Sequence, residues 1–137
     1  MGGGAVERSR DWLAQARGDL ALARYAFSGG FYDWTVFAAQ QAAEKAVKGA
    51  LQSRGAEVWG HSVATLLRAL AAQVPVPDEL VDAALELDKG YIAARYPDVH
   101  PSGAPRELYT RTEAERALAY GERIVEFCAR LVAGADA

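Results

Sequence analysis

The sequence predicts an all-α protein, a five-helix antiparallel bundle with a four-helix up-and-down core and a short connecting helix. Half of the residues (51%) are hydrophobic and alanine is abundant, which favours helices. β-branched residues are too scattered for strand-like runs, and apolar residues recur at helical spacing in five segments. We expect a single domain over residues 9–133, preceded by a flexible leader over residues 1–8.

The first two helices are predicted over residues 9–27 and 32–54, with a Ser-Gly-Gly run between them. Asp33 is expected to cap the second helix and Gly55 to end it. One broad face of this second helix is rich in alanine, whose small side chain permits other helices to approach closely. We therefore expect the second helix at the centre of the bundle.

The third helix is predicted over residues 63–72, and the fourth runs from about residue 77 to residue 95. Ser62 is the natural N-cap of the third helix. Pro97 ends the fourth helix, because proline disfavours an α conformation at the residue before it. The third helix is short enough to act as a connector between the long ones.

A proline-rich loop is predicted over residues 97–110, before a final helix that extends to about residue 132. Thr112 and Glu115 have the spacing of a capping box for that helix. Cys128, the single cysteine, falls on the apolar side of the helix and cannot form an intramolecular disulfide. We expect a buried thiol in a reducing compartment.

Charge and hydropathy exclude two classes of protein. A net charge of −3 and a pI near 5.4 argue against a surface devoted to DNA or anionic lipid, although a local basic patch is allowed. No apolar run approaches the roughly 20 residues that cross a bilayer, and the N-terminus has no signal-peptide core. The sequence predicts a soluble, cytoplasmic protein that does not bind membranes.

Asp88 and Arg95 lie between two apolar flanks of the predicted fourth helix. Charges in such a position are costly unless they are paired or hydrogen-bonded. The two residues are about 10 Å apart along the helix axis, too far for a simple intrahelical pair. A structural polar network, a ligand pocket and a dimer seam all satisfy this pattern, and pairing within or between chains stays open.

Four blocks in order resemble a HEPN domain over residues 12–132. They are "WLAQARGDLALA", "FAAQQAAEKAVKGAL", "HSVATLL" and "LDKGYIAARYPD", starting at residues 12, 37, 61 and 87. The resemblance implies a small helical bundle that forms a homodimer or higher homo-oligomer. It also implies that the protein pairs with a minimal nucleotidyltransferase in a toxin–antitoxin, defence or regulatory system.

Some branches of this family are metal-independent RNases that use an Arg followed four to six residues later by a His. Arg95 and His100 fit that spacing, and they could stabilise a phosphorane and transfer a proton. The sequence departs from the nuclease form, because Tyr96 replaces a polar residue and Pro97 moves the His onto a loop. Ser102 replaces the tyrosine of toxins that a partner modifies. RNase activity is therefore the alternative hypothesis.

A nucleotide-binding bundle is a third hypothesis, although the chain has no glycine-rich phosphate loop. The candidate residues for a nucleotide site or buried polar seam are Asp88, Tyr91, Arg95, Lys45, Lys48 and His61. His61, just before a helix cap, has a structural interpretation at the end of the bundle as well. The simplest interpretation of Glu44, Lys45 and Lys48 is a solvated face. Their neighbours Trp34, Phe37 and Gln41 could instead meet a partner chain or stack on bases. Neither a metal nor another cofactor is predicted.

Overall fold

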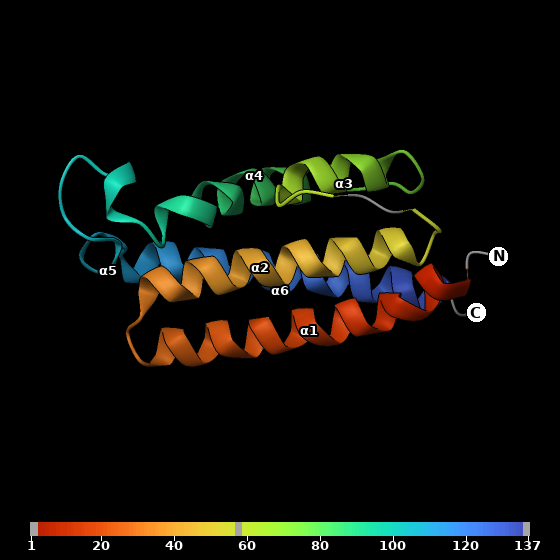
Figure 1. Ribbon diagram of the computed structural model, residues 1–137, viewed down its shortest axis with the longest axis horizontal. Helices are drawn as coiled ribbons and strands as arrows, with labels where there is room; N and C mark the ends of the chain where they lie inside the picture. Colours follow the sequence, from red (N-terminus) through yellow and green to blue (C-terminus); the bar gives the residue numbers. More distant parts are fainter. Residues whose placement is uncertain (1–2, 57–58, 136–137) are drawn as a thin grey trace.

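The computed structural model describes residues 3–56 and 59–135, and within these the regular elements are all helices, with no strand. The predicted all-α class is confirmed. The elements are α1 (Gly3–Ser28), α2 (Tyr32–Gln52), α3 (Val63–Ala71), α4 (Asp78–Ala93), the 3-10 helix η1 (Pro97–Val99), α5 (Pro105–Leu108) and α6 (Arg111–Ala135). Figure 1 shows α1, α2 and α6 running side by side, with α3 and α4 along the opposite side of α2.

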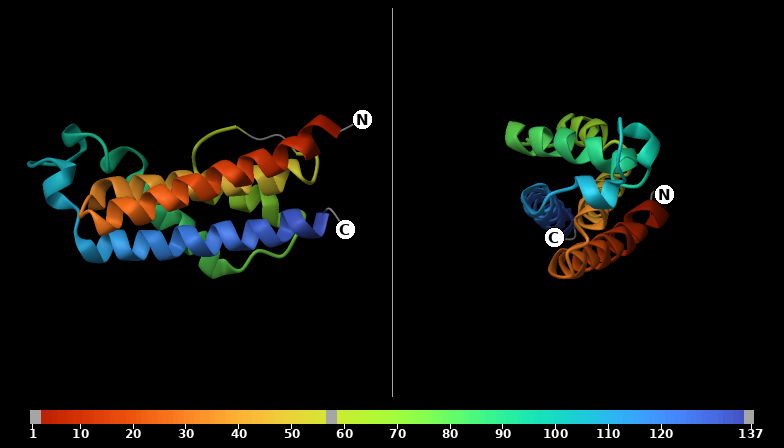
Figure 2. Two further views of the ribbon diagram at one scale, coloured as in Figure 1. Left: turned by 90° about the horizontal axis from the view of Figure 1, so that it is seen from below. Right: turned by 90° about the vertical axis from the view of Figure 1, so that its left-hand side faces the viewer.

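The helix α2 lies at the centre of the molecule, as its alanine content predicted. It packs against α1, α6, α3 and α4, and the end-on view of Figure 2 shows it enclosed by them. Its alanines from Ala38 to Ala50 are almost all inaccessible, and four polar residues on it are buried as well: Asp33, Thr35, Gln40 and Glu44. Buried polar groups usually have hydrogen-bond partners, so the contacts of these side chains indicate where α2 contributes to a site.

Two glycines allow the neighbouring helices to approach α2 closely. A Cβ at Gly90 of α4 would lie 2.5 Å from Cγ1 of Val36, and a Cβ at Gly121 of α6 would lie 3.2 Å from the carbonyl oxygen of Ala39. Both positions are buried within their helices. The spacing of α4 from α2 therefore depends on the absence of a side chain at Gly90.

Helix capping agrees with the sequence analysis at one of three positions. The Ser62 hydroxyl accepts a hydrogen bond from the Thr65 amide at the start of α3, as predicted. The prediction for α2 was wrong, because Phe31 is its N-cap and Asp33 lies in the first turn, with Oδ1 buried and without a hydrogen-bond partner among the described residues.

The capping box of α6 is also displaced. The Thr110 hydroxyl accepts from the Glu113 amide at 3.1 Å, and the Glu113 carboxylate accepts from the Thr110 amide at 3.0 Å. Thr112 and Glu115 have the same spacing but are solvent-exposed. The sequence contains two overlapping matches to the motif, and the chain uses the first.

The N-terminal segment and the predicted loop also differ from expectation. The first helix begins at Gly3 rather than at residue 9, so most of the predicted leader is helical, while residues 1–2 lie outside the described part. The segment expected to be a loop contains η1 and α5, and each begins at a proline whose fixed φ suits the first helical position.

Cys128 is fully buried in α6, as the sequence predicted, and burial raises the pKa of its thiol to about 12. No described helix is long and apolar enough to cross a membrane.

Replacement of Gly90 by alanine is expected to destabilise the fold by about 1–3 kcal/mol, because the new methyl group overlaps Val36 and forces α4 away from α2. Gly18→Ala on the exposed side of α1 is the matched control. There the nearest atom is 3.9 Å away, and the better helix propensity of alanine should add up to about 1 kcal/mol of stability. Urea unfolding measures both, and equal effects of the two variants would contradict the close α2–α4 contact.

Candidate functional site

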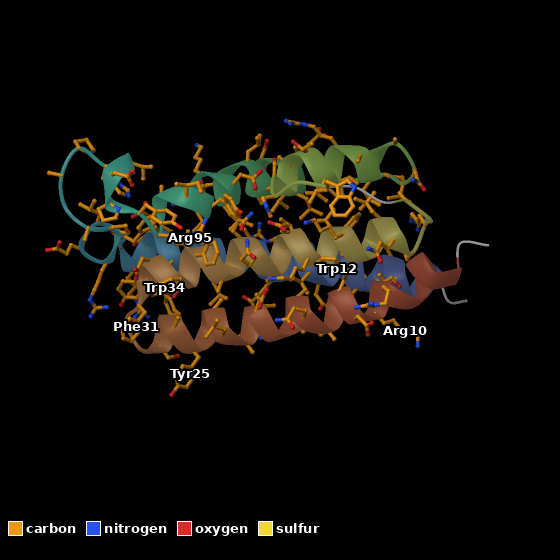
Figure 3. The ribbon with its side chains drawn as sticks, in the orientation of Figure 1. Arg10, Trp12, Tyr25, Phe31, Trp34 and Arg95 are labelled. Carbon is orange, nitrogen blue, oxygen red and sulfur yellow. The ribbon has the colours of Figure 1, made fainter. Side chains whose placement is uncertain are left out.

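Figure 3 shows Arg95 between α4 and α2. Its side chain contacts three aromatic rings, Phe37, Tyr91 and Tyr96, which we call the aromatic shelf. Its Cζ is 4.3 Å from the ring centroid of Phe37, 4.9 Å from that of Tyr91 and 5.1 Å from that of Tyr96. Its Nε donates a hydrogen bond to the Tyr91 carbonyl at 2.9 Å. The rings and this bond fix the guanidinium plane, while its terminal nitrogens have no hydrogen-bond partner among the described residues. A fixed, open guanidinium is suited to a phosphate or carboxylate.

His61 lies on the same aromatic group, immediately before the N-cap of α3. Its ring stacks on Tyr91 at a centroid distance of 4.9 Å and an interplanar angle of 16°. Its Nδ1 donates to the buried Glu44 carboxylate at 3.3 Å, and its carbonyl accepts from the Gln40 side chain at 2.9 Å. The histidine side chain is nevertheless 59% exposed. Three contacts thus hold an accessible imidazole in one place.

Asp88 binds the N-terminus of α3. Its carboxylate accepts hydrogen bonds from the Ser62 hydroxyl at 2.9 Å and from the amides of Val63 and Ala64 at 2.8 and 3.0 Å. The first amides of a helix have no intrahelical partners and carry a partial positive charge, so they compensate the carboxylate. No contact joins Asp88 to Arg95 in the described part of the chain. Asp88 therefore fixes α3, and with it His61, against α4.

The charged residues of α2 lie between helices rather than on a solvated face, so the simplest interpretation of their pattern was wrong. Glu44 is 4% exposed, and its Oε2 accepts from Lys48 at 3.0 Å as well as from His61. Lys45 forms an ion pair with Asp19 of α1 at 2.5 Å, and both side chains are largely buried. The reason is that α1 packs along this side of α2.

A row of rings connects the His61 end of the site to the α1 side of the molecule. Successive centroids are 6.2 Å apart from Tyr91 to Phe37 and 6.0 Å apart from Phe37 to Trp34. Trp34, which is 51% exposed, borders a surface hollow of about 270 Å³ together with Phe37 and Lys45. Exposed aromatic rings beside cations are the elements with which proteins stack on nucleobases.

His100 lies apart from this row. Its Nε2 donates to the Ala93 carbonyl at 2.7 Å, and its ring meets the edge of Tyr109 at a centroid distance of 6.4 Å. His100 and Tyr109 border a different hollow, of about 370 Å³. Burial, and then the charges of Glu113 and Asp33, raise the pKa of Tyr109. No hydrogen bond, ion pair or ring contact joins His100 to Arg95 within residues 3–56 and 59–135.

The structure thus brings together three of the predicted site residues, His61, Tyr91 and Arg95, and ties Asp88 to them through α3. Lys48 belongs to the same cluster through Glu44, whereas Lys45 lies at the α1 side and His100 at the loop. The sequence analysis missed the contact of Phe37 with Arg95 and the burial of Glu44 beside His61. The sequence did indicate a role for Phe37. A large aromatic residue beside alanines on the central helix is expected to pack at an interface between helices.

The site offers anion-binding groups rather than metal ligands. Among the described residues, no three His, Cys, Asp or Glu side chains are grouped so that they could hold a metal ion. The accessible groups are the terminal nitrogens of Arg95 and the imidazole of His61, with aromatic faces between them. Such a set can bind a phosphate, stack on a base and exchange a proton.

Comparison with known proteins identifies relatives of the whole domain. The sequence matches the model of the HEPN domain family over residues 9–131. A protein of Methanocaldococcus jannaschii named "Putative toxin MJ1304" is 26% identical over 130 residues, which cover 88% of this chain and 86% of that protein.

Solved structures with the same fold have higher sequence identity. TT1696 from Thermus thermophilus is 50% identical, with a TM-score of 0.88 over 90% of this chain and 98% of that one. ST0689, an archaeal HEPN homologue, is 42% identical, with a TM-score of 0.78 over 91% and 98% of the two chains. A HEPN domain protein of Thermotoga maritima, TM0613, is 45% identical, with a TM-score of 0.75 over 90% and 98%.

Replacement of Asp88 by asparagine is expected to lower the free energy of unfolding by about 1.5–3 kcal/mol, because three donors lose a charged acceptor. Asp82→Asn, at an exposed position of the same helix, should stay within about 0.5 kcal/mol of the wild type. Thermal and urea unfolding measure the two variants. Equal stability of Asp88→Asn and Asp82→Asn would show that Asp88 does not hold α3.

Proposed function

The chain belongs to the HEPN domain family, and from this premise we propose that it is a toxin-type module of a bacterial or archaeal toxin–antitoxin, defence or regulatory system. The name of the M. jannaschii relative supports the toxin-type role. We propose further that the protein acts in the cytoplasm as a homodimer or higher homo-oligomer beside a minimal nucleotidyltransferase.

The observation that carries the proposal is the open guanidinium of Arg95 on its aromatic shelf. Phe37, Tyr91 and Tyr96 desolvate the faces of the cation and leave its terminal nitrogens for a ligand. Arginine held in this way presents two parallel donors to a phosphate. We propose that the ligand is a phosphate of RNA or of a nucleotide, and that neighbouring exposed rings such as Trp34 stack on a base.

Exposed apolar residues on α4 and just after it support self-association. Leu85 and Ile92 lie about two turns apart on α4, Tyr96 follows after the end of the helix, and the three residues are 42%, 43% and 48% exposed. Large apolar side chains gathered on an exposed surface are typical of protein interfaces. A dimer formed through these residues would place the Arg95 sites of two chains near each other.

The second candidate function is metal-independent cleavage of RNA by Arg95 and His100. One observation favours it: the histidine that follows α4 is held in place by its Nε2 contact to Ala93, while its Nδ1 has no hydrogen-bond partner among the described residues. An imidazole of this kind could transfer a proton, and Arg95 could stabilise the charged phosphorane. The third candidate, a nucleotide-binding bundle, would use the same shelf without a reaction.

Arg95→Ala is expected to weaken binding of a fluorescein-labelled single-stranded oligoribonucleotide by about tenfold or more, measured by fluorescence anisotropy at low salt. Because one phosphate contact is lost, the slope of log K against log salt should also fall by about 0.7. Arg130→Ala, an exposed arginine of α6 remote from the shelf, is the matched control and should bind like the wild type. Equal losses in both variants would indicate unspecific charge attraction and contradict an Arg95 site.

Sedimentation equilibrium at micromolar concentration is expected to show a dimer or higher oligomer, and Ile92→Glu should shift it toward the monomer, because a charge in an apolar interface is costly. Asp82→Lys, a charge change on an exposed polar position of α4, should leave the association unchanged. The proposed dimeric partner module is contradicted if the wild type is a monomer and if a nucleotidyltransferase encoded by a neighbouring gene does not co-purify with it.

A further inference from the structure

The imidazole of His61 is held more firmly than its exposure requires. The ring is 59% exposed, yet it stacks on Tyr91, bonds to Glu44 and has its backbone carbonyl bound by Gln40. A histidine that only fills the end of a bundle needs no buried carboxylate. We propose that His61 is the proton-transfer residue of the Arg95 site and that Glu44 is its positioning residue. This inference rests on the proposed function, because it requires that RNA binds at Arg95.

The contact between His61 and Glu44 determines which ring nitrogen faces the ligand. A carboxylate only accepts hydrogen bonds, so Nδ1 must carry the proton that it donates to Glu44. The lone pair of the neutral ring is therefore on Nε2, which has no hydrogen-bond partner among the described residues. In known acid–base sites a carboxylate likewise fixes the tautomer and the orientation of the catalytic histidine.

Glu44 is itself held in one position. It is 4% exposed, and it accepts hydrogen bonds from Lys48 at 3.0 Å and from Gln41 at 3.5 Å. The ion pair with Lys48 compensates the cost of a buried carboxylate, and each of these residues lies on α2. The orientation of His61 is thus set by the most buried helix of the molecule.

Tyr91 places His61 beside the phosphate site. The imidazole stacks on its ring at 4.9 Å, and Cζ of Arg95 lies 4.9 Å from the same ring. The guanidinium and the imidazole therefore contact the same tyrosine ring, and the proposal requires a single nucleotide to span the two groups. His100 lacks this arrangement, because its Nε2 is bonded to the Ala93 carbonyl and its ring contacts Tyr109.

The proposed step is an internal transesterification of RNA. Nε2 of His61 takes the proton of a ribose 2′-hydroxyl, the 2′-oxygen forms a bond to the adjacent phosphorus, and the bond from phosphorus to the 5′-oxygen breaks. The leaving 5′-oxygen takes a proton from water, and the histidine returns its proton to the solvent. The products are a 2′,3′-cyclic phosphate and a 5′-hydroxyl, and neither an oxidant nor a metal is required. Arg95 stabilises the negative charge on the phosphorane oxygens.

The test compares His61→Gln with His100→Gln, since these are the only two histidines of the chain. Cleavage of a single-stranded RNA substrate in excess EDTA gives kcat and KM, and fluorescence anisotropy with a 2′-deoxy analogue of the substrate gives binding. His61→Gln is expected to lower kcat by about 100-fold or more while binding is kept. His100→Gln should lower kcat much less, and Arg130→Ala should not change it.

Glu44→Gln gives a second and independent readout. Because Glu44 contacts the histidine rather than the substrate, this variant should lower kcat by about 10- to 100-fold and leave KM unchanged. Circular dichroism and thermal unfolding confirm that each variant folds. If Glu44 has only a structural role, Glu44→Gln lowers stability and the active fraction together. In that case kcat returns to the wild-type value at a lower temperature, where the variant is fully folded.

The outcomes separate this inference from the proposed function. If His100→Gln abolishes cleavage and His61→Gln does not, the inference falls while an Arg95-dependent RNase stands. If the wild type binds RNA through Arg95 but does not cleave it, the inference falls and a binding module remains. If the wild type neither binds nor cleaves RNA, the proposed RNA site itself is wrong.

Discussion

The site depends on one constraint, the set of hydrogen bonds between the Asp88 carboxylate and the N-terminus of α3. It joins two helices that are separate in the sequence, because one carboxylate satisfies two backbone amides and the Ser62 hydroxyl at once. His61 immediately precedes this cap, so the same bonds place it beside α4. Tyr91, about one helical turn after Asp88, then presents its ring to the imidazole.

The helix α2 supplies the rigid support for this arrangement. Its alanines and the close contacts at Gly90 and Gly121 allow four helices to surround it. It also carries buried polar groups, Gln40 and Glu44, and both of them contact His61. Burial of a carboxylate opposes folding unless it is paired, and both Lys48 and His61 donate hydrogen bonds to Glu44. The site is therefore built from a stable core outward to an exposed ring.

Much of the fold follows from local patterns in the sequence, whereas the site depends on contacts between distant segments. Alanine content predicted the central α2, and Ser62 was recognisable as a cap because its hydroxyl acts within one turn. The isolated charges of Asp88 and Arg95 were also recognisable. The partners of these two residues could not be recognised, because the N-terminus of α3 and the aromatic shelf come close to them only when the chain folds. The burial of Glu44 depends on how α1 and α3 pack against α2. Helical periodicity in the sequence carries no information about this packing.

The most direct test of the account is nuclear magnetic resonance of the protein with ¹³C-labelled histidine, titrated with a single-stranded oligoribonucleotide. Two histidines give two sets of imidazole signals, and single His→Gln variants assign them. The account predicts that the His61 signals shift or broaden as RNA binds, and that this change is absent in Arg95→Ala. A change confined to His100, or an unchanged His61 in protein saturated with RNA, would contradict a site on the His61, Tyr91 and Arg95 cluster.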